Sequence, residues 1–261
     1  PALVAGVLAI PATYAVTRAL YNARTALLAA AFLATSATMV LYSTNARGYS
    51  MVVVVFLLMA LAAVRLQRSP TRAMWIALSV LAAIGLWTIP VMLYPLGAVS
   101  LWLMLTFLLE SRGGDARRLV ASLAAGGLLT LTAYWPVFTR EGARAVVANK
   151  FVTGSPWPEF LRDLWDTGLD TLAAWGIGLP PIVAIALFAF VIFALARHSA
   201  LTTTRVGLPL AAYAWSAWLL IVTHRAPFRR VWLWLFPVVA ALAAAGLLAA
   251  MERWAPARAL A

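Results

Sequence analysis

Apolar residues fill most of this chain in long runs, and short polar clusters interrupt them. Nine of these runs approach the roughly 17 to 25 residues that a helix needs to cross the hydrocarbon core of a bilayer. They occupy residues 2–20, 26–43, 50–66, 73–89, 91–109, 118–139, 181–197, 206–223 and 231–251. The pattern predicts an all-α fold, a polytopic bundle of about nine membrane helices.

Two of the runs meet at Ile89 and Pro90. Proline can begin a helix, but it disfavours the helical conformation in the residue before it. We therefore expect a tight turn near a membrane surface at this point.

Residues 140–180 form the one extended stretch of mixed polarity, and they carry five of the eight acidic residues. Apolar residues recur there at three- and four-residue spacing, at Phe160, Leu161, Leu164, Trp165, Leu169 and Leu172. This spacing predicts an amphipathic helix over 158–175 that lies flat on the membrane. Two interpretations are open: a covering helix whose tryptophans join an aromatic interface belt, or a lid that faces a substrate.

The composition agrees with a membrane protein. The chain is 64% hydrophobic and 11% charged, whereas a soluble domain is roughly half apolar and about a quarter charged. Its net charge of +12 sits in short clusters without a continuous basic face, so anionic lipid headgroups are the expected partners and nucleic acid is not. The chain has no cysteine, which excludes disulfides and thiol chemistry.

The positions of arginine and lysine predict the topology. If the first helix runs inward, twelve of these residues fall in inner loops and eight in outer loops, and the inner loops are the short ones, to which the positive-inside rule applies. The N-terminus is then outside and the C-terminus inside. Six helices are expected in 1–139, an extracytoplasmic loop with the amphipathic helix in 140–180, and three helices in 181–261.

Motifs of soluble enzymes are missing from the sequence: a glycine-rich phosphate loop with lysine, the HExxH pair and the GxSxG elbow. His198 and His224 fall on opposite sides of the membrane in the predicted topology and cannot share a metal ion. The residues indicate no metal site and no cofactor, and they leave a need for a divalent metal open.

Cationic side chains gather at the outer ends of the predicted helices. The sequence Asn-Ala-Arg-Gly-Tyr at 45–49 interrupts two apolar runs, and a charge near the hydrocarbon boundary is costly unless it snorkels, pairs or binds an anion. A second cluster, His224, Arg225, Arg229 and Arg230, precedes the last helix on the same side. Arginine's planar fork suits phosphate. Anchoring to lipid headgroups is the alternative for both clusters.

Two further outer cations, Arg140 and Lys150, belong to the loop region. They are either substrate contacts or solvated loop charges.

The residues at 42–49, Tyr-Ser-Thr-Asn-Ala-Arg-Gly-Tyr, resemble the Tyr-Ser-x-Glu/Gln-Ala-Arg-x-Tyr element of a superfamily of bacterial membrane glycosyltransferases. This is the superfamily of dolichyl-phosphate-mannose-protein mannosyltransferases and aminoarabinose transferases, which share the GT-C fold. The sequence Arg-Val-Trp-Leu-Trp-Leu-Phe-Pro at 230–237 resembles the start of their last conserved helix. The similarity of pattern spans nearly the whole chain, and the element at 45–49 is its most specific part.

The resemblance implies transfer of a sugar from a polyprenyl-phosphate donor to a lipid, glycan or protein acceptor at the outer face of the bacterial inner membrane. It implies that basic residues hold the donor phosphate. The residues expected to do so are Arg47, Tyr49, Arg229 and Arg230, with Asn45, Arg140, Lys150, His224 and Arg225 as possible substrate contacts. Asn45 stands where the relatives usually have Glu or Gln.

The acidic residue that these enzymes carry in their first outer loop has no counterpart in this chain. Because Pro1 is followed at once by a hydrophobic helix, we expect a further helix and that acidic loop upstream of Pro1, and the catalytic residue is unknown. Glu141 and Glu159 are outer carboxylates that the chain itself offers.

A transporter or flippase for a lipid-linked or anionic substrate is the alternative function. Transporters tend to have polar or interrupted helices at the bilayer midplane and internal repeats. The sequence has few ionisable residues within its apolar runs and no visible repeat, which favours the transferase. A non-catalytic membrane scaffold is a third interpretation.

Overall fold

The computed structural model of the chain describes residues 1–45, 47–142, 154–202, 204 and 206–254, and the regular elements in these ranges are all helices. The elements are α1 (Ala2–Leu20), α2 (Ala23–Thr35), α3 (Ala37–Thr44), α4 (Tyr49–Arg68), α5 (Arg72–Thr88), η1 (Pro90–Met92), α6 (Leu93–Leu109), α7 (Gly113–Glu141), α9 (Trp157–Trp175), α10 (Pro181–Ala196), α11 (His198–Leu201), α12 (Leu208–Thr223), η2 (Arg229–Leu235) and α13 (Phe236–Trp254). The prediction of an all-α bundle is confirmed.

Each of the nine predicted apolar segments is helical over most of its length, but the helices differ in length. Within the residues that the structure describes, five are long and apolar enough to span a membrane, and α2 with α3 makes a sixth if the pair is one bent span. The apolar helices α5, α10 and α12 have 17, 16 and 16 residues, and at about 1.5 Å per residue a helix of this length is shorter than the roughly 30 Å hydrocarbon core. The chain is thus consistent with an integral membrane protein of five or six spans, and a total of nine stays a prediction.

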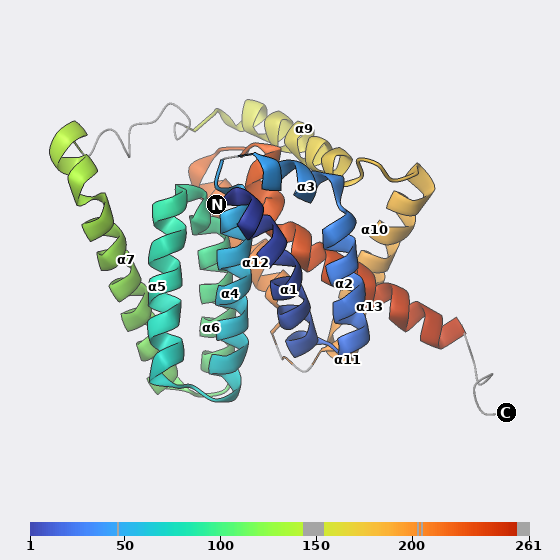
Figure 1. Cartoon of the computed structure of the whole chain (residues 1–261), viewed down its shortest axis with the longest axis horizontal. Helices are drawn as coiled ribbons and strands as arrows, with labels where there is room; N and C mark the ends of the chain where they lie inside the picture. Colours follow the sequence, from blue (N-terminus) through green and yellow to red (C-terminus); the bar gives the residue numbers. More distant parts are fainter. Residues whose placement is uncertain (46, 143–153, 203, 205, 255–261) are drawn as a thin grey trace.

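The predicted segment 26–43 is not one straight helix. Its two parts, α2 and α3, meet at an angle of 59°. Ser36 between them has φ −69° and ψ 117°, and its Oγ accepts a hydrogen bond from the Met39 N–H at 3.3 Å. Serine at this position satisfies a free N–H of the new helix, so α3 starts in a new direction at the top of the bundle in Figure 1.

The predicted turn at Ile89 and Pro90 is confirmed. Ile89 is extended, with φ −157° and ψ 136°, and η1 begins at Pro90. The chain therefore reverses direction between α5 and α6.

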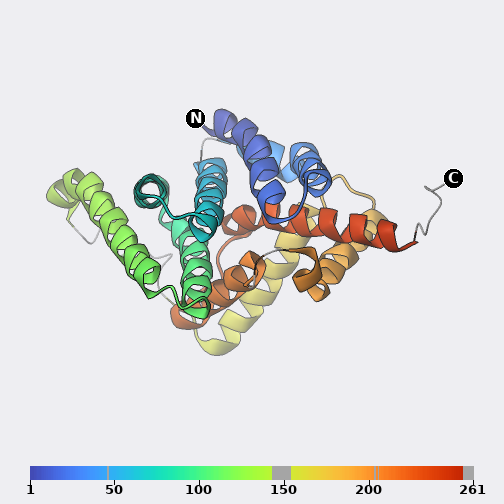
Figure 2. The ribbon, with the colours of Figure 1, turned by 90° about the horizontal axis from the view of Figure 1, so that it is seen from below.

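The bundle has two distinct ends, and they separate the loops as the topology predicts. In Figure 1 the N-terminus, α3, α9 and the segment before α13 lie at the top, while the turns after α1, α4 and α6 lie at the bottom together with α11. The top is therefore called the outer end below. Figure 2 shows α7 at one side of the bundle, with α5 between it and the other helices.

The packing core lies around α4, whose buried side chains contact the helices on either side. Phe56 in α4 packs edge-on against Trp234 in η2, with ring centroids 5.0 Å apart. Trp102 in α6 is fully buried and donates its indole N–H to the Val206 carbonyl at 2.8 Å. The first contact fixes η2, and with it Arg229 and Arg230, against α4, and the second joins α6 to the segment before α12.

At the inner end, Arg112 links α4 to the turn between α6 and α7. Its guanidinium donates to the carbonyls of Gln67 at 2.8 Å and Leu66 at 3.2 Å, and it pairs with Asp115 at 2.8 Å. Burial acts to lower the pKa of Arg112, but the hydrogen bonds to Glu110 and Asp115 raise it above its usual value. The side chain thus stays charged and satisfies carbonyls at the end of α4, where helices leave such groups without partners.

Replacing Arg112 with alanine is expected to destabilise the protein by about 1–3 kcal/mol, because carbonyls and a carboxylate that are partly buried lose their partner. Thermal unfolding in detergent would measure the loss. The control is Arg118→Ala, since Arg118 also pairs with Asp115, at 3.0 Å, but its side chain is 64% exposed and exposed pairs contribute little. Equal unfolding temperatures for the two variants would contradict the role given to Arg112.

Candidate anion-binding site

An open pocket of about 360 Å³ lies at the outer end of the bundle. Three parts of the chain that are distant in sequence form its walls: the end of α3 with the loop after it, the middle of α9, and the start of η2. The lining residues are Leu41, Tyr42, Asn45, Arg47, Thr167, Asp170, Phe228, Arg229 and Arg230. The pocket therefore joins the two predicted basic clusters in one site.

The loop that carries Asn45 and Arg47 turns sharply into α4. The Arg47 N–H donates to the Asn45 carbonyl at 2.8 Å, and Gly48 has φ 72°. This left-handed conformation favours glycine, and a side chain here would also press on Ile89. The turn leaves Arg47 exposed at the pocket.

Arg230 is the most firmly held of the three arginines. Its Nε donates to the Tyr49 hydroxyl at 2.9 Å, and its Cζ lies 4.6 Å from the centroid of the Phe228 ring. A guanidinium over an aromatic face is attracted by the ring. Among the described residues, only the Nε of Arg230 donates a hydrogen bond, so its terminal N–H groups can bind an anion. Tyr49 lies next to the site, as the sequence predicts. It does not line the pocket itself but accepts the hydrogen bond from Arg230.

The first turn of α9 is attached to the loop after α12. The His224 ring lies 4.2 Å from the Trp157 ring centroid and 5.9 Å from that of Phe160. The Ser155 N–H donates to the His224 carbonyl at 3.0 Å. His224 therefore contributes to the site by positioning α9, and it does not line the pocket.

The last turn of α9 is attached to α3 and α13. Thr38 donates its hydroxyl to the Ala174 carbonyl, and the rings of Trp175 and Phe236 meet edge-on with centroids 5.6 Å apart. With both ends held, α9 crosses the outer end of the bundle (Figure 1). It covers part of the outer end, and one flank of it also forms a wall of the pocket, so both interpretations of the sequence stay open.

That wall contributes Thr167 and Asp170, two residues that sequence reasoning does not single out. The acids of α9 recur at Glu159, Asp163, Asp166 and Asp170, a spacing that places them on one flank of a helix. This signal predicts an acidic flank, but it does not say which neighbour the flank faces.

The pocket combines three cationic side chains with one carboxylate. Among the described residues, Asp170 forms no ion pair within 4.0 Å, so the arginines are not neutralised by direct contact. Arginine binds phosphate oxygens through two parallel N–H bonds. The site can therefore accept a phosphate or another compact oxyanion.

The remaining predicted contacts lie outside the pocket. Arg140 is exposed in the last turn of α7 and does not line the pocket. Lys150 falls outside the described residues. Arg225 is half-buried in the loop between α12 and η2 without lining the pocket. Glu159 is exposed near the start of α9 and does not line it either.

The part of the chain that the structure describes contains no group of three or more potential metal ligands of the His, Cys, Asp or Glu type. Its two histidines lie at opposite ends, since His198 begins α11 at the inner end and His224 packs on α9 at the outer end (Figure 1). They do not share a site.

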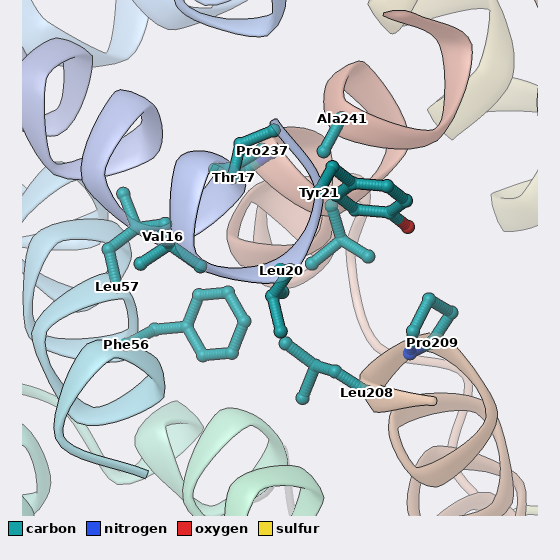
Figure 3. A pocket seen from close by; sticks show the side chains of 11 residues that line it. Val16, Thr17, Leu20, Tyr21, Phe56, Leu57, Leu208, Pro209, Pro237 and Ala241 are labelled. Atoms are coloured by element: carbon teal, nitrogen blue, oxygen red, sulfur yellow. The ribbon is translucent and has the colours of Figure 1, made fainter. Parts of the chain in front are cut away.

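A second cavity lies between α1, α4, α12 and α13, and it differs from the first in size and lining. It measures only about 20 Å³, and apolar side chains such as Leu20, Phe56 and Leu208 surround it (Figure 3). Tyr21 borders it, and burial raises the pKa of this phenol to about 12, so the hydroxyl stays neutral. This cavity is a packing void and offers no charged group to a substrate.

Comparison of the chain with protein-family models, with curated proteins and with solved structures gives no match. The function is therefore inferred from the residues of the pocket and from the resemblance at 45–49.

Proposed function

We propose that this chain is part of a GT-C-type membrane glycosyltransferase of the bacterial inner membrane. It would move a sugar from a polyprenyl-phosphate donor to a lipid, glycan or protein acceptor at the extracytoplasmic face. The observation that supports this most strongly is the meeting of Arg47 with Arg229 and Arg230 in one open pocket. The transferase motif that the sequence resembles contains the first of these arginines, and the segment that resembles the last conserved helix begins with the third.

The chemistry of the pocket fits the reaction. The leaving group in such a transfer is a polyprenyl phosphate, on which negative charge develops as the bond to the sugar breaks. Fixed donors aimed at that charge lower the barrier because they need no rearrangement, and Arg230 is already held by Tyr49 and Phe228. The exposed apolar residues of α9, among them Trp165 at 69% and Leu161 at 56% exposure, suit the membrane surface from which a lipid-linked donor arrives.

Binding of undecaprenyl phosphate to the protein in nanodiscs tests the proposal. Arg229→Ala is expected to weaken binding by about tenfold or more, as the loss of a charge-assisted hydrogen bond to phosphate implies. Arg162→Ala is the matched control, because it removes the same charge from an exposed position on α9 outside the pocket. If both variants weaken binding equally, general surface charge is responsible and the proposal is wrong.

A further inference from the structure

The helix α9 has three sectors, and each meets a different environment. Phe160, Thr171 and Ala174 are buried against the bundle. The apolar residues Leu161 and Trp165 lie on one exposed flank, and the four acids lie on the other. Because the buried sector fixes the rotation of the helix, the acidic flank meets the pocket at Asp170, whereas Glu159, Asp163 and Asp166 do not line it.

The pocket is therefore bipolar. Arg47, Arg229 and Arg230 offer only hydrogen-bond donors, whereas an ionised Asp170 offers only acceptors. A phosphate bound by the arginines is repelled by a carboxylate, so the part of a ligand next to Asp170 must be a hydrogen-bond donor. In a glycosyl transfer the donors near the phosphate are hydroxyl groups of a carbohydrate.

Other residues of the same pocket suit a carbohydrate. Asn45 and Thr167 supply an amide and a hydroxyl, each of which can donate and accept. Tyr42 and Phe228 supply aromatic surface, against which the C–H face of a sugar ring can pack. A pocket that bound an isolated phosphate would need neither group.

We propose that Asp170 is a carbohydrate-binding residue that accepts a hydrogen bond from a hydroxyl group while the arginines hold the phosphate. The inference rests on the proposed function and adds to it the wall that recognises the sugar side of the substrate. The hydroxyl belongs either to the sugar on the donor or to the acceptor. Asp170 needs no large movement to serve this purpose, since α9 is held at His224 and at Thr38.

The test compares undecaprenyl phosphate with undecaprenyl phosphate that carries mannose, glucose or arabinose. For the wild-type protein in nanodiscs, at least one glycosylated probe should bind more tightly than the bare carrier. In Asp170→Asn this preference is expected to fall about tenfold, the loss expected for a hydrogen bond to a charged group. Binding of the bare carrier should be unchanged or tighter, because a negative charge near the arginines is gone.

A second measurement separates the two sources of the hydroxyl. If Asp170→Asn keeps the preference for the glycosylated probe but slows sugar transfer by tenfold or more in proteoliposomes, the hydroxyl belongs to the acceptor. If the preference itself falls, it belongs to the donor sugar. If both the preference and the transfer rate stay at the wild-type level, the inference is overturned.

Asp166→Asn is the matched control, since it removes one charge from the same flank at an exposed residue that does not line the pocket. It should leave both measurements within about twofold of wild type, as distant surface charges are screened. A loss of bare-carrier binding in Asp170→Asn would show that the residue holds α9 in place, which also overturns the inference. Failure of the proposed function is seen separately, as unchanged binding of undecaprenyl phosphate in Arg229→Ala.

Discussion

Arg47→Ala is expected to lower the kcat/KM of sugar transfer by at least about 100-fold, the cost typical of removing one hydrogen-bond donor from a site of developing charge. Membrane insertion should be unaffected, because Arg47 is exposed and lies in a loop. Transfer from a polyprenyl-phosphate sugar in proteoliposomes measures the effect. The loss should appear mainly in kcat if the arginine acts on the leaving phosphate in the transition state.

Arg140→Ala is the control for this prediction. Arg140 is another exposed arginine, but it lies in the last turn of α7 and does not line the pocket. Its replacement should leave transfer close to wild type. Normal transfer by Arg47→Ala would remove the main support for a transferase, whereas an equal loss in both variants would point to orientation in the membrane instead of chemistry.

Gly246→Ala is expected to destabilise the protein by about 1–3 kcal/mol, as is typical of overpacking. Gly246 lies in α13, and a Cβ atom there would clash with the backbone carbonyl of Phe190 in α10. Since the obstacle is backbone, α10 and α13 would have to move apart. Small residues commonly permit such close approach between membrane helices.

Gly127→Ala tests whether this loss comes from packing. Gly127 also lies within a helix, α7, and its added methyl group would meet nothing within 4 Å. The same substitution should therefore be neutral or slightly stabilising, because alanine favours helix more than glycine does. Equal unfolding temperatures for the two variants in detergent would contradict the close contact between α10 and α13.

Much of the fold follows from the apolar pattern. Long apolar runs must be helical in a bilayer, because the backbone has no water with which to bond. The bend between α2 and α3 could not be predicted in this way, since the apolar run continues through it. Ser36 was its sequence signal, as serine frequently caps a new helix.

The site could be predicted in part. The positions of Arg47 and of Arg229 and Arg230 on one face follow from helix count and charge bias. Their meeting in one pocket depends on how α4 and η2 pack, which periodicity does not encode. To place Asp170 in the pocket from the sequence, one would have to know the rotation of α9 about its axis. Contacts with distant segments determine that rotation: Phe160 meets His224, and Ala174 meets Thr38.

The attachment of α9 has a consequence for the interpretation of mutants. Its two ends rest on His224 and Phe236, which flank the segment that carries Arg229 and Arg230. The acidic wall of the pocket is thereby attached to the same segment that carries the basic wall. Loosening either end would shift the acidic wall relative to the basic one, so substitutions at Trp157 and at Arg229 should combine non-additively in double-mutant cycles, although their side chains belong to different elements.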